Sequence, residues 1–552
     1  MALLIKVNDF MDKNKLNKLF TNKYFILFSI LFIGIFLRLY NLTGKSIWYD
    51  EACSLNQAAY SWNDIFFHND INHPLPKPVY FILLKSWAVL SGYNEFSVRL
   101  LSVIFGVISI FAIYKLGKIM FGEKTGLISA FLIAISPYNI YYSQQARYYT
   151  LFLILSLTSM FFFIKIITGK ESKRILYFWY TLANILIFYT FQVGIYILII
   201  QYFIFLMFKK KIVNKADWLK TQKILFAFLL PILYFYVAFI IFNVGNYNDS
   251  HLKFNPSGPN LNSLIETIEV FSYGGPTQAH AGVGFRIADE RLIAPRILAV
   301  LFCFLFILSF FYYRRIKNTA SEVGLSYKDR IIFLWLWLFL SISGLYLFSN
   351  LIRPMYLTRY LIGIAPSFYI IIAGVLAKMS KVKCRILIVT IIFFSVFSLN
   401  VLYFPGPDRD WRKAARYINA LIKNNDILVL APVMQILPFW YYYKYKKGLN
   451  KYFANNIDRY GEKFYNKANF QIIDGSNPVI GGDTEYIIRI LSEPKYKYND
   501  IWLIISPDWL GRDSTDRLKN YLGRIRVSGE SKYFNYDGVE FVRYLSAGYA
   551  TN

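Results

Sequence analysis

The sequence predicts a polytopic α-helical membrane protein with about eleven transmembrane helices, followed by a small extracytoplasmic α/β domain. Three observations lead to this fold class. Of the 552 residues, 56% are hydrophobic and only 17% are charged, whereas soluble domains carry about 25% charged residues. Apolar runs of about 17 or more residues recur over the first 403 positions, which is the length that a membrane span needs. After position 403 the apolar runs become short and alternate with polar stretches.

The apolar runs define the expected order of spans. The first, 24–37, follows a basic N-terminal stretch and lacks a small-residue cleavage site, so we expect a retained span with a cytoplasmic N-terminus. The other ten expected spans are 98–114, 126–142, 149–164, 175–190, 193–208, 224–243, 292–313, 331–349, 357–377 and 386–403. The run 79–90 is shorter and carries Lys85, so we expect a helix lying in the membrane interface within a first outer loop, 41–97.

The basic residues follow the positive-inside rule for this order of spans. Lys and Arg number 27 in the loops that the order places inside and 8 in those that it places outside. A further span at 79–90 would move the Lys-rich loops outside, so the charge bias rejects it. The net charge of +28 is therefore explained by topology, and nucleic acid is not expected as a partner because the charge is not gathered in one groove.

The chain divides into a transmembrane domain, 1–403, and a second domain, 404–552. In the second domain, 427–430 and 501–505 are expected as short buried strands, and 538–544 as an edge or terminal strand. An odd number of spans after a cytoplasmic N-terminus places this domain outside the cytoplasm. Its basic residues do not oppose that placement, since long domains translocate largely regardless of charge.

The cysteines and histidines provide no recognisable metal or disulfide motif. The three cysteines, Cys53, Cys303 and Cys384, are scattered, and none belongs to a CxxC pair. The four histidines lack the spacing of an HExxH site. No cofactor is expected with certainty, and a requirement for a divalent metal stays open.

The polar residues that suit chemistry all fall on the expected outer side. They are Asp50, Glu51, His73, Lys77, Arg99, Arg147, Tyr148, Arg353, Arg359 and Tyr360. Taken alone, the Asp-Glu pair suits the first turn of a helix, and each arginine suits an anchor at the membrane interface. Four arginines beside an acidic pair on one leaflet are harder to explain as anchors, because charges at membrane depth usually mark function or pairing.

This set of side chains suits a reaction that begins with a lipid-linked phosphate and needs a base. Arginine and lysine bind phosphate oxygens and stabilise the charge of a leaving phosphate. A carboxylate can accept the proton of an attacking hydroxyl. A phosphate leaving group needs no strong general acid, which accounts for the lack of an obvious second, well-separated acid.

The motifs around these residues resemble a known family. Arg-Leu-Tyr-Asn-Leu at 38–42 and Ser-Ile-Trp-Tyr-Asp-Glu-Ala at 46–52 resemble the first-loop signature of GT-C type membrane glycosyltransferases. More narrowly, the chain is similar to the protein O-mannosyltransferase and aminoarabinose-transferase (ArnT-like) superfamily, which comprises glycosyltransferase family 39 and its bacterial relatives. Further matching stretches are 73–81, 92–102, 116–122, 136–149, 354–361 and 410–418. The resemblance covers most of 38–150 well and the remainder loosely.

The resemblance implies a GT-C fold in the cell (inner or plasma) membrane and an inverting transfer from a polyprenyl-phosphate sugar to an acceptor hydroxyl outside the cytoplasm. The acceptor would be a glycolipid, a glycan or a protein. Asp50 is implied as the catalytic base, and Glu51 as a residue that supports the site or binds acceptor or metal. The residues implied in donor or phosphate binding are His73, Lys77, Arg99, Arg147, Tyr148, Arg359 and Tyr360.

Two departures from the family pattern and several alternatives stay open. Gln145 stands where relatives often carry Glu, and His73 opens His-Pro-Leu-Pro-Lys-Pro in place of His-Pro-Pro, so the role of Lys77 is open. The loop 244–291, which holds His280, is either a lid or a disordered connection. The alternative functions are a transporter or flippase of a lipid-linked glycan, which the lack of an internal repeat disfavours, and a glycan polymerase or ligase of another membrane fold.

Overall fold

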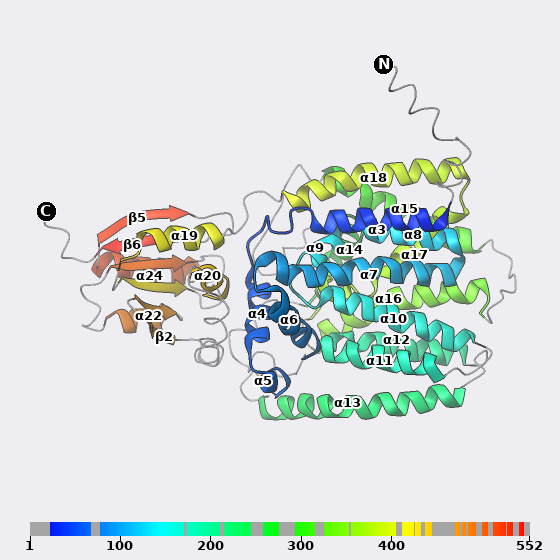
Figure 1. Cartoon of the computed structure of the whole chain (residues 1–552), viewed down its shortest axis with the longest axis horizontal. Helices are drawn as coiled ribbons and strands as arrows, with labels where there is room; N and C mark the ends of the chain where they lie inside the picture. Colours follow the sequence, from blue (N-terminus) through cyan, green and yellow to red (C-terminus); the bar gives the residue numbers. More distant parts are fainter. Residues whose placement is uncertain are drawn as a thin grey trace, which may run out of the picture.

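The chain folds into a bundle of long helices with a smaller α/β domain beside one end of it (Figure 1). The structure is a computed structural model. It describes residues 22–67, 78–169, 174–209, 215–243, 258–274, 293–314, 325–352, 355–404, 411–423, 426–431, 436–443, 470–474, 477–481, 484–492, 500–505, 512–525, 527–533 and 540–545.

The bundle contains a helix at each of the eleven expected spans. These are α3 (Lys23–Leu39), α7 (Glu95–Phe121), α8 (Glu123–Ile135), α10 (Tyr149–Thr168), α11 (Arg174–Thr190), α12 (Ile195–Phe208), α13 (Lys215–Asn243), α15 (Ile293–Arg314), α16 (Tyr327–Leu351), α17 (Ala365–Lys378) and α18 (Lys381–Tyr403). Within the described residues, α7, α10, α15, α16 and α18 are long and apolar enough to cross a membrane. The predicted class, a polytopic α-helical membrane protein, is confirmed.

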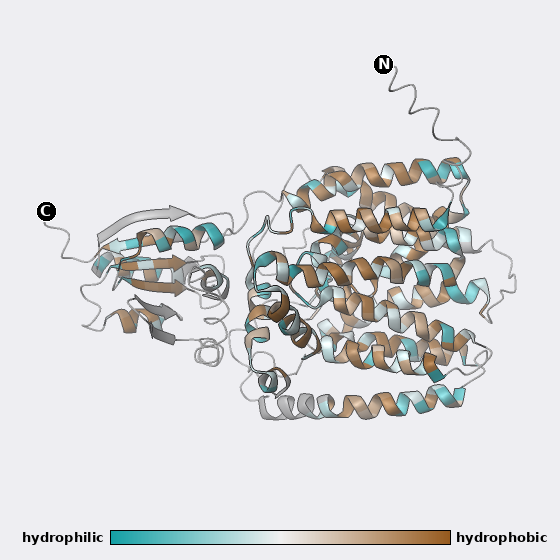
Figure 2. Cartoon of the chain, viewed as in Figure 1, coloured by the Kyte–Doolittle hydropathy of each residue, from teal (hydrophilic) through white to brown (hydrophobic). Residues whose placement is uncertain are grey.

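The outer surface of the bundle is apolar, as a lipid environment requires. Figure 2 shows hydrophobic residues along most of the length of the bundle helices and hydrophilic residues toward their ends. On α3, the side chains of Phe28, Phe32 and Phe36 are 57–67% exposed and share one face, because they are four residues apart. Exposing such a stripe to water would cost about 25 cal/mol per Å², whereas in lipid it costs nothing.

Two of the expected spans are interrupted near the same end of the bundle. The run 126–142 divides into α8, which ends at Ile135, and the short helix α9 (Pro137–Ser143). Pro137 has no N–H to continue α8, and the Ser136 side chain caps α9 by accepting a hydrogen bond from the Asn139 N–H. The run 357–377 begins as a 3₁₀ turn, η5 (Thr358–Leu361), before α17 starts. Each interruption places an arginine side chain, Arg147 or Arg359, beside Asp50 of α4 (Tyr49–Ala59).

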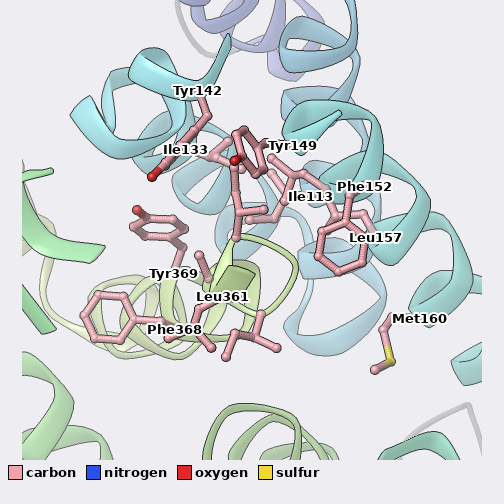
Figure 3. Close-up of a cluster of buried hydrophobic side chains, with 14 of the residues drawn as sticks. Ile113, Ile133, Tyr142, Tyr149, Phe152, Leu157, Met160, Leu361, Phe368 and Tyr369 are labelled. Carbon is pink, nitrogen blue, oxygen red and sulfur yellow. The ribbon is translucent and has the colours of Figure 1, made fainter. Parts of the chain in front are cut away.

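The interior of the bundle is packed with aromatic and aliphatic side chains from α7 to α10 and from α17. Figure 3 shows part of this core, in which Tyr142 and Tyr149 lie beside Ile113 and Ile133 and face Leu361 and Tyr369. Helices α7 and α8 approach closely at a glycine: a Cβ on Gly126 would lie only 2.7 Å from the Tyr114 carbonyl oxygen. Small residues at helix contacts are the usual means of close packing in membranes.

The segment 79–90 forms a helix, α6 (Pro78–Ser91), which lies near α4 and α5 (Trp62–Phe67) at one end of the bundle (Figure 1). Its residues Tyr80, Leu84 and Ala88 are buried against the bundle. The Lys85 ammonium donates a hydrogen bond to the Tyr60 carbonyl and lies 4.9 Å from the ring centroid of Trp62. The charge that makes this helix unsuitable as a span therefore has a structural role.

In the described part of the loop 244–291, residues 258–274, helix α14 (Leu261–Tyr273) packs against the bundle. The Tyr369 hydroxyl donates to the Phe271 carbonyl at 2.9 Å, and Thr267 Oγ1 shares a 2.7 Å hydrogen bond with the Tyr356 hydroxyl. A disordered connection is therefore wrong for 258–274, since these bonds fix α14 to the bundle. The remaining parts, 244–257 and 275–291 with His280, lie outside the described residues.

The α/β domain contains a six-stranded sheet among its described residues, with strand order β2-β3-β1-β4-β6-β5. The strands are β1 (Ile427–Ala431), β2 (Phe470–Asp474), β3 (Asn477–Gly481), β4 (Ile501–Ile505), β5 (Val527–Tyr533) and β6 (Glu540–Leu545). The central strands β3, β1 and β4 are parallel and the outer pairings antiparallel. Its described helices include α19 (Trp411–Leu421), α20 (Ile436–Tyr443), α22 (Thr484–Leu491) and α24 (Arg512–Ile525).

Strands β1 and β4 are buried on both faces. Leu428 and Trp502 pack in one cluster with α19 and α20, whereas Val429 and Leu503 pack in another with α22 and α24. Covered parallel strands read as continuous apolar runs, which is why the sequence reveals β1 and β4. Strands β2, β3 and β5 carry no such run, and the sequence does not reveal them.

Candidate active site

Helix α4 places the two acids at its N-terminus. Trp48 precedes the helix in an extended conformation, and Asp50 and Glu51 occupy the first turn. The Trp48 N–H donates a 3.4 Å hydrogen bond to Glu51 Oε2. The prediction that the Asp-Glu pair lies in the first turn of a helix therefore holds for the backbone. Carboxylates in the first turn also interact favourably with the helix dipole.

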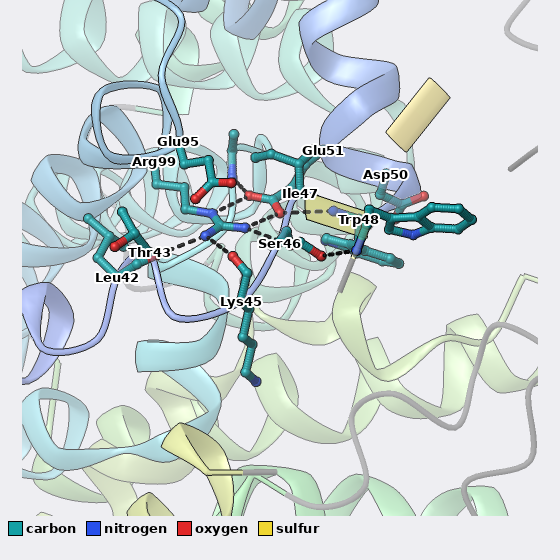
Figure 4. A network of polar contacts seen from close by, with 12 residues as sticks. Leu42, Thr43, Lys45, Ser46, Ile47, Trp48, Asp50, Glu51, Glu95 and Arg99 are labelled. Carbon is teal, nitrogen blue, oxygen red and sulfur yellow. Dashed lines mark hydrogen bonds and ion pairs between the residues drawn. The ribbon is translucent and has the colours of Figure 1, made fainter. Parts of the chain in front are cut away.

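Glu51 forms a buried, two-pronged ion pair with Arg99 of α7, drawn in Figure 4. Arg99 Nε donates to Oε1 at 2.8 Å and Nη2 donates to Oε2 at 2.7 Å, and the side chains are 3% and 1% exposed. Glu51 Oε1 also accepts the Ala146 N–H at 2.9 Å. Glu51 therefore ties α4 both to α7 and to the loop that precedes α10.

Arg99 uses all five of its N–H groups within the protein. Besides the two bonds to Glu51, Nη1 donates to the Leu42 and Lys45 carbonyls at 2.8 Å each, and Nη2 donates to the Ser46 carbonyl at 3.1 Å. A guanidinium has five donors and no acceptor. Arg99 thus has no donor left for a phosphate, and its expected place among the donor-binding residues has no support in these contacts.

Asp50 lies between two arginines that are far apart in sequence. Its Oδ2 lies 3.4 Å from Arg359 Nη1 and 3.7 Å from Arg147 Nη2. Arg147 follows α9 and Arg359 lies in η5, so the two interrupted spans carry the arginines to the acid. These separations are longer than those between Arg99 and Glu51. The three formal charges sum to +1, which favours an additional anion.

The guanidinium of Arg147 stays charged in this setting. Burial lowers its pKa, but the Asp50 carboxylate and the neighbouring phenols of Tyr148 and Tyr149 raise it, and the result is a pKa well above the usual value. Its Nη1 donates a 3.0 Å hydrogen bond to Ser54 Oγ on the next turn of α4. Arg147 is therefore a fixed positive charge beside Asp50.

Several buried polar atoms at this site have no protein partner among the described residues. They include Arg147 Nε, Arg359 Nε and the hydroxyl of Tyr149. Tyr149 interacts electrostatically with Arg359 and Asp50, so its hydroxyl belongs to the same group of residues. Leaving a buried donor unsatisfied costs about 1–3 kcal/mol. A ligand with phosphate or sugar oxygens would satisfy these atoms.

An aromatic wall, which comprises Tyr148, Phe191 and Tyr360, flanks the arginines. Phe191 stacks on Tyr148 with centroids 5.1 Å apart and contacts Tyr360 at 4.9 Å. The guanidinium carbons of Arg147 and Arg359 lie 5.0 and 5.5 Å from the ring centroids of Tyr148 and Tyr360. These cation–π contacts hold the guanidiniums in place. Phe191 was not expected, although it lies in the tight turn between two spans.

Not all of the expected site residues fall within the described part of the chain. The structure brings together Asp50, Arg147, Tyr148, Arg359 and Tyr360. His73, Lys77 and Arg353 lie outside the described residues. Within the described residues, no group of three or more His, Cys, Asp or Glu side chains is arranged to hold a metal ion.

Comparisons with known proteins agree with this architecture. The family model of dolichyl-phosphate-mannose-protein mannosyltransferases matches residues 72–235. The fold is similar to that of ArnT from Cupriavidus metallidurans bound to undecaprenyl phosphate, with a TM-score of 0.55 and 10% sequence identity over 94% of this chain and 97% of that chain. It is also similar to archaeal oligosaccharyltransferase AglB from Archaeoglobus fulgidus in complex with an inhibitory peptide and a dolichol-phosphate, with a TM-score of 0.50 and 12% identity over 94% of this chain and 74% of that chain. No curated protein matches the sequence. The GT-C fold and the resemblance to GT-C type glycosyltransferases are thereby confirmed.

Proposed function

We propose that this protein is an integral membrane glycosyltransferase that moves a sugar from a polyprenyl-phosphate-linked donor to an acceptor hydroxyl on the extracytoplasmic side. The observation that carries the proposal is the Asp50 carboxylate lying within 3.7 Å of two arginines, Arg147 and Arg359. The comparisons support the donor class, because the similar ArnT structure is bound to undecaprenyl phosphate and the AglB structure to a dolichol-phosphate.

The three charged groups can divide the work of an inverting displacement. Asp50 accepts the proton of the acceptor hydroxyl as its oxygen forms a bond to the anomeric carbon. The bond between that carbon and the donor phosphate oxygen breaks at the same time, and polyprenyl phosphate leaves with the electron pair. Arg147 and Arg359 stabilise the charge that develops on the phosphate. Attack from the face opposite the phosphate inverts the anomeric configuration.

The distances between Asp50 and its two arginines suit a site in which a donor phosphate takes over part of their contacts. At 3.4 and 3.7 Å, the two arginines hold the carboxylate more loosely than Arg99 holds Glu51 at 2.7 Å. A donor phosphate would compete for the same guanidiniums, because planar arginines bind phosphate oxygens in pairs. Asp50 would then face the acceptor hydroxyl and accept its proton.

Arg99 receives a different role from the donor binding first expected, whereas Glu51 keeps support of the site, one of its expected alternatives. We assign Glu51 and Arg99 to positioning, since both are buried and each satisfies the other. The binding of acceptor or metal by Glu51 therefore has no support in the geometry. Tyr148 and Tyr360 supply an aromatic wall for the sugar or the first isoprene unit of the donor. His73 and Lys77 stay proposed as donor contacts on the resemblance alone.

The test is Asp50→Asn in the full-length protein purified with its endogenous lipid. The bound polyprenyl-linked sugar is first identified by mass spectrometry, and its transfer to acceptor is then measured. We expect a loss of at least about 100-fold, the usual lower bound for removing a general base. The control is Asp217→Asn, since Asp217 lies in the first turn of α13, away from the described site, and should not change the rate.

Two results would refute the proposal. Transfer by Asp50→Asn at nearly the wild-type rate would show that Asp50 is not the base. Movement of a lipid-linked glycan across a vesicle membrane without any sugar transfer would instead support the transporter or flippase alternative.

A further inference from the structure

The α/β domain contacts the segment that leads into α4. We call residues 42–48 the lead-in loop, because α4 and its Asp50 follow it directly. In Figure 1, α20 lies next to α4, at the end of the bundle that also carries α5 and α6. The contacts are made by the starts and ends of two helices, Trp411 and Arg412 of α19 and Tyr441 and Tyr442 of α20.

Glu95, the first residue of α7, is the centre of this contact. Arg412 donates two hydrogen bonds to the Glu95 carboxylate, one from Nε to Oε1 at 3.1 Å and one from Nη2 to Oε2. The Tyr442 hydroxyl donates to the same carboxylate. That hydroxyl also accepts the Ile47 N–H at 2.7 Å. One phenol therefore joins the start of α7 to the lead-in loop.

Three further hydrogen bonds cross the same contact. The Trp411 N–H donates to Ser46 Oγ at 3.3 Å, and Arg412 Nη2 donates to the Thr43 carbonyl at 2.9 Å. The Tyr441 hydroxyl donates to the Tyr93 carbonyl at 2.7 Å. The α/β domain therefore binds backbone and side-chain groups along most of the lead-in loop.

The other side of the lead-in loop is held by Arg99, one turn after Glu95 on α7 (Figure 4). Arg99 binds the Leu42, Lys45 and Ser46 carbonyls while it pairs with Glu51. The loop carries no regular secondary structure, so these side chains replace the backbone bonds of a helix or strand. Removing either set would leave the loop fixed from one side only.

The side chains at this contact are partly buried, so their hydrogen bonds are strengthened. The side chains of Glu95 and Arg412 are 12% and 29% exposed. Burial, together with the Glu95 carboxylate, raises the pKa of Tyr442, so its hydroxyl stays protonated and donates. Hydrogen bonds to a charged partner are roughly twice as strong as those between neutral groups.

We propose that the α/β domain positions the catalytic base: through Tyr442 and Arg412 it holds the lead-in loop against α7 and thereby fixes where α4 presents Asp50. Tyr442 and Arg412 are positioning residues, since neither lies among the residues around Asp50. The kinetic part of this inference rests on the proposed glycosyl transfer. The structural part does not.

The experiment compares Tyr442→Phe with wild type in the full-length detergent-solubilised protein. Hydrogen exchange of peptides that cover 42–59 is measured by mass spectrometry, and transfer is measured in parallel. Removing the hydroxyl leaves the Ile47 N–H without its acceptor, so exchange in the lead-in loop should rise about 10-fold, the factor that corresponds to one such bond. kcat should fall by a similar factor, with the KM for donor within about twofold, because Arg147 and Arg359 are untouched.

Two further variants make the result specific. Glu95→Gln keeps the volume of the side chain and should reproduce both effects, and the double variant should add little, since both changes break one network. Arg517→Ala removes an exposed ion pair with Glu485 elsewhere in the same domain and should change neither exchange in 42–59 nor kcat.

The outcomes separate this inference from the proposed function. Unchanged exchange in the lead-in loop of both Tyr442→Phe and Glu95→Gln would overturn the inference. Faster exchange in the lead-in loop with an unchanged kcat would overturn the claim that the α/β domain positions the base. If the wild-type protein transfers no sugar, the proposed function fails, and the exchange measurement alone decides whether the domain holds the loop.

Discussion

Asp50 and Glu51 are neighbours in the chain, yet their surroundings differ in every respect that matters for chemistry. Glu51 is buried and accepts hydrogen bonds from Arg99, Ala146 and Trp48. Asp50 has a side chain 14% exposed and lies at 3.4 and 3.7 Å from two arginines. Because successive residues of a helix point about 100° apart, one acid can face α7 while the next faces the site. The contacts of Glu51 fit a structural role, and those of Asp50 fit the role of base that we propose for it.

This difference predicts that two similar substitutions lower the free energy of unfolding by different amounts. Glu51→Gln removes the counter-ion of a buried guanidinium, so the free energy of unfolding should fall by about 3–5 kcal/mol, as for other broken buried pairs. Asp50→Asn should lower the free energy of unfolding by less, since the Asp50 carboxylate lies 3.4 and 3.7 Å from its two arginines, whereas Glu51 and Arg99 are 2.7 Å apart. Thermal unfolding in detergent, followed by tryptophan fluorescence, measures both. A Glu51→Gln protein that is inactive but as stable as wild type would instead return Glu51 to a direct role in catalysis.

At the scale of elements, the break between α8 and α9 depends on one buried arginine of α3. Arg38 donates to the Gly34, Ala134 and Ile133 carbonyls at 3.0–3.1 Å and to Ser143 Oγ at 3.1 Å. The last carbonyls of α8 lack intrahelical donors because Pro137 has no N–H. A cation at a helix C-terminus also interacts favourably with the dipole. Arg38 thus joins α3, α8 and α9, and it fixes the helix that precedes Arg147.

Arg38→Met should therefore lower the free energy of unfolding by about 3 kcal/mol, from the loss of several charge-assisted hydrogen bonds. Arg38→Lys should recover only part of that loss, because one ammonium cannot reach α8 and α9 together in the way a planar guanidinium does. Gly106→Ala tests the same contact, since its Cβ would lie 2.2 Å from Ser143 Oγ and 3.1 Å from Arg38 Nε. If Arg38→Met unfolds at the same temperature as wild type, Arg38 does not stabilise the break between α8 and α9.

At the scale of the whole molecule, much of the architecture follows from hydropathy and charge. The eleven described bundle helices coincide with the apolar runs, and β1 and β4 with two buried apolar runs. The breaks at Pro137 and η5 were not expected, because the side chains remain apolar through them. Helix α14 was not expected, because it lies within a long loop between two apolar runs. Predicting that Arg147 and Arg359 face one acid needed the topology of the bundle, since 309 positions separate Asp50 from Arg359.

The ends of the bundle are consistent with the expected sidedness. The loops at 115–125, 314–330 and 378–385 are all expected inside, and their neighbouring residues contact each other. Arg330 Nη1 donates to the Met120 carbonyl at 2.9 Å, and the Tyr312 hydroxyl donates to the Lys378 carbonyl at 3.0 Å. The described residues that border these loops therefore lie at one end of the bundle, as the expected order of spans requires.

A cysteine introduced at Thr277, in a background without the three native cysteines, should therefore react with a membrane-impermeant maleimide in intact cells. Thr277 lies outside the described residues, in the loop after α14 that the order of spans places on the extracytoplasmic side. The matched control is Ser321→Cys in a loop expected inside, which should react only after permeabilisation. Reversed labelling would place the site that surrounds Asp50 in the cytoplasm. Transfer from a polyprenyl-linked donor would then have to occur on the cytoplasmic face, because α4 and the α/β domain lie at one end of the bundle (Figure 1).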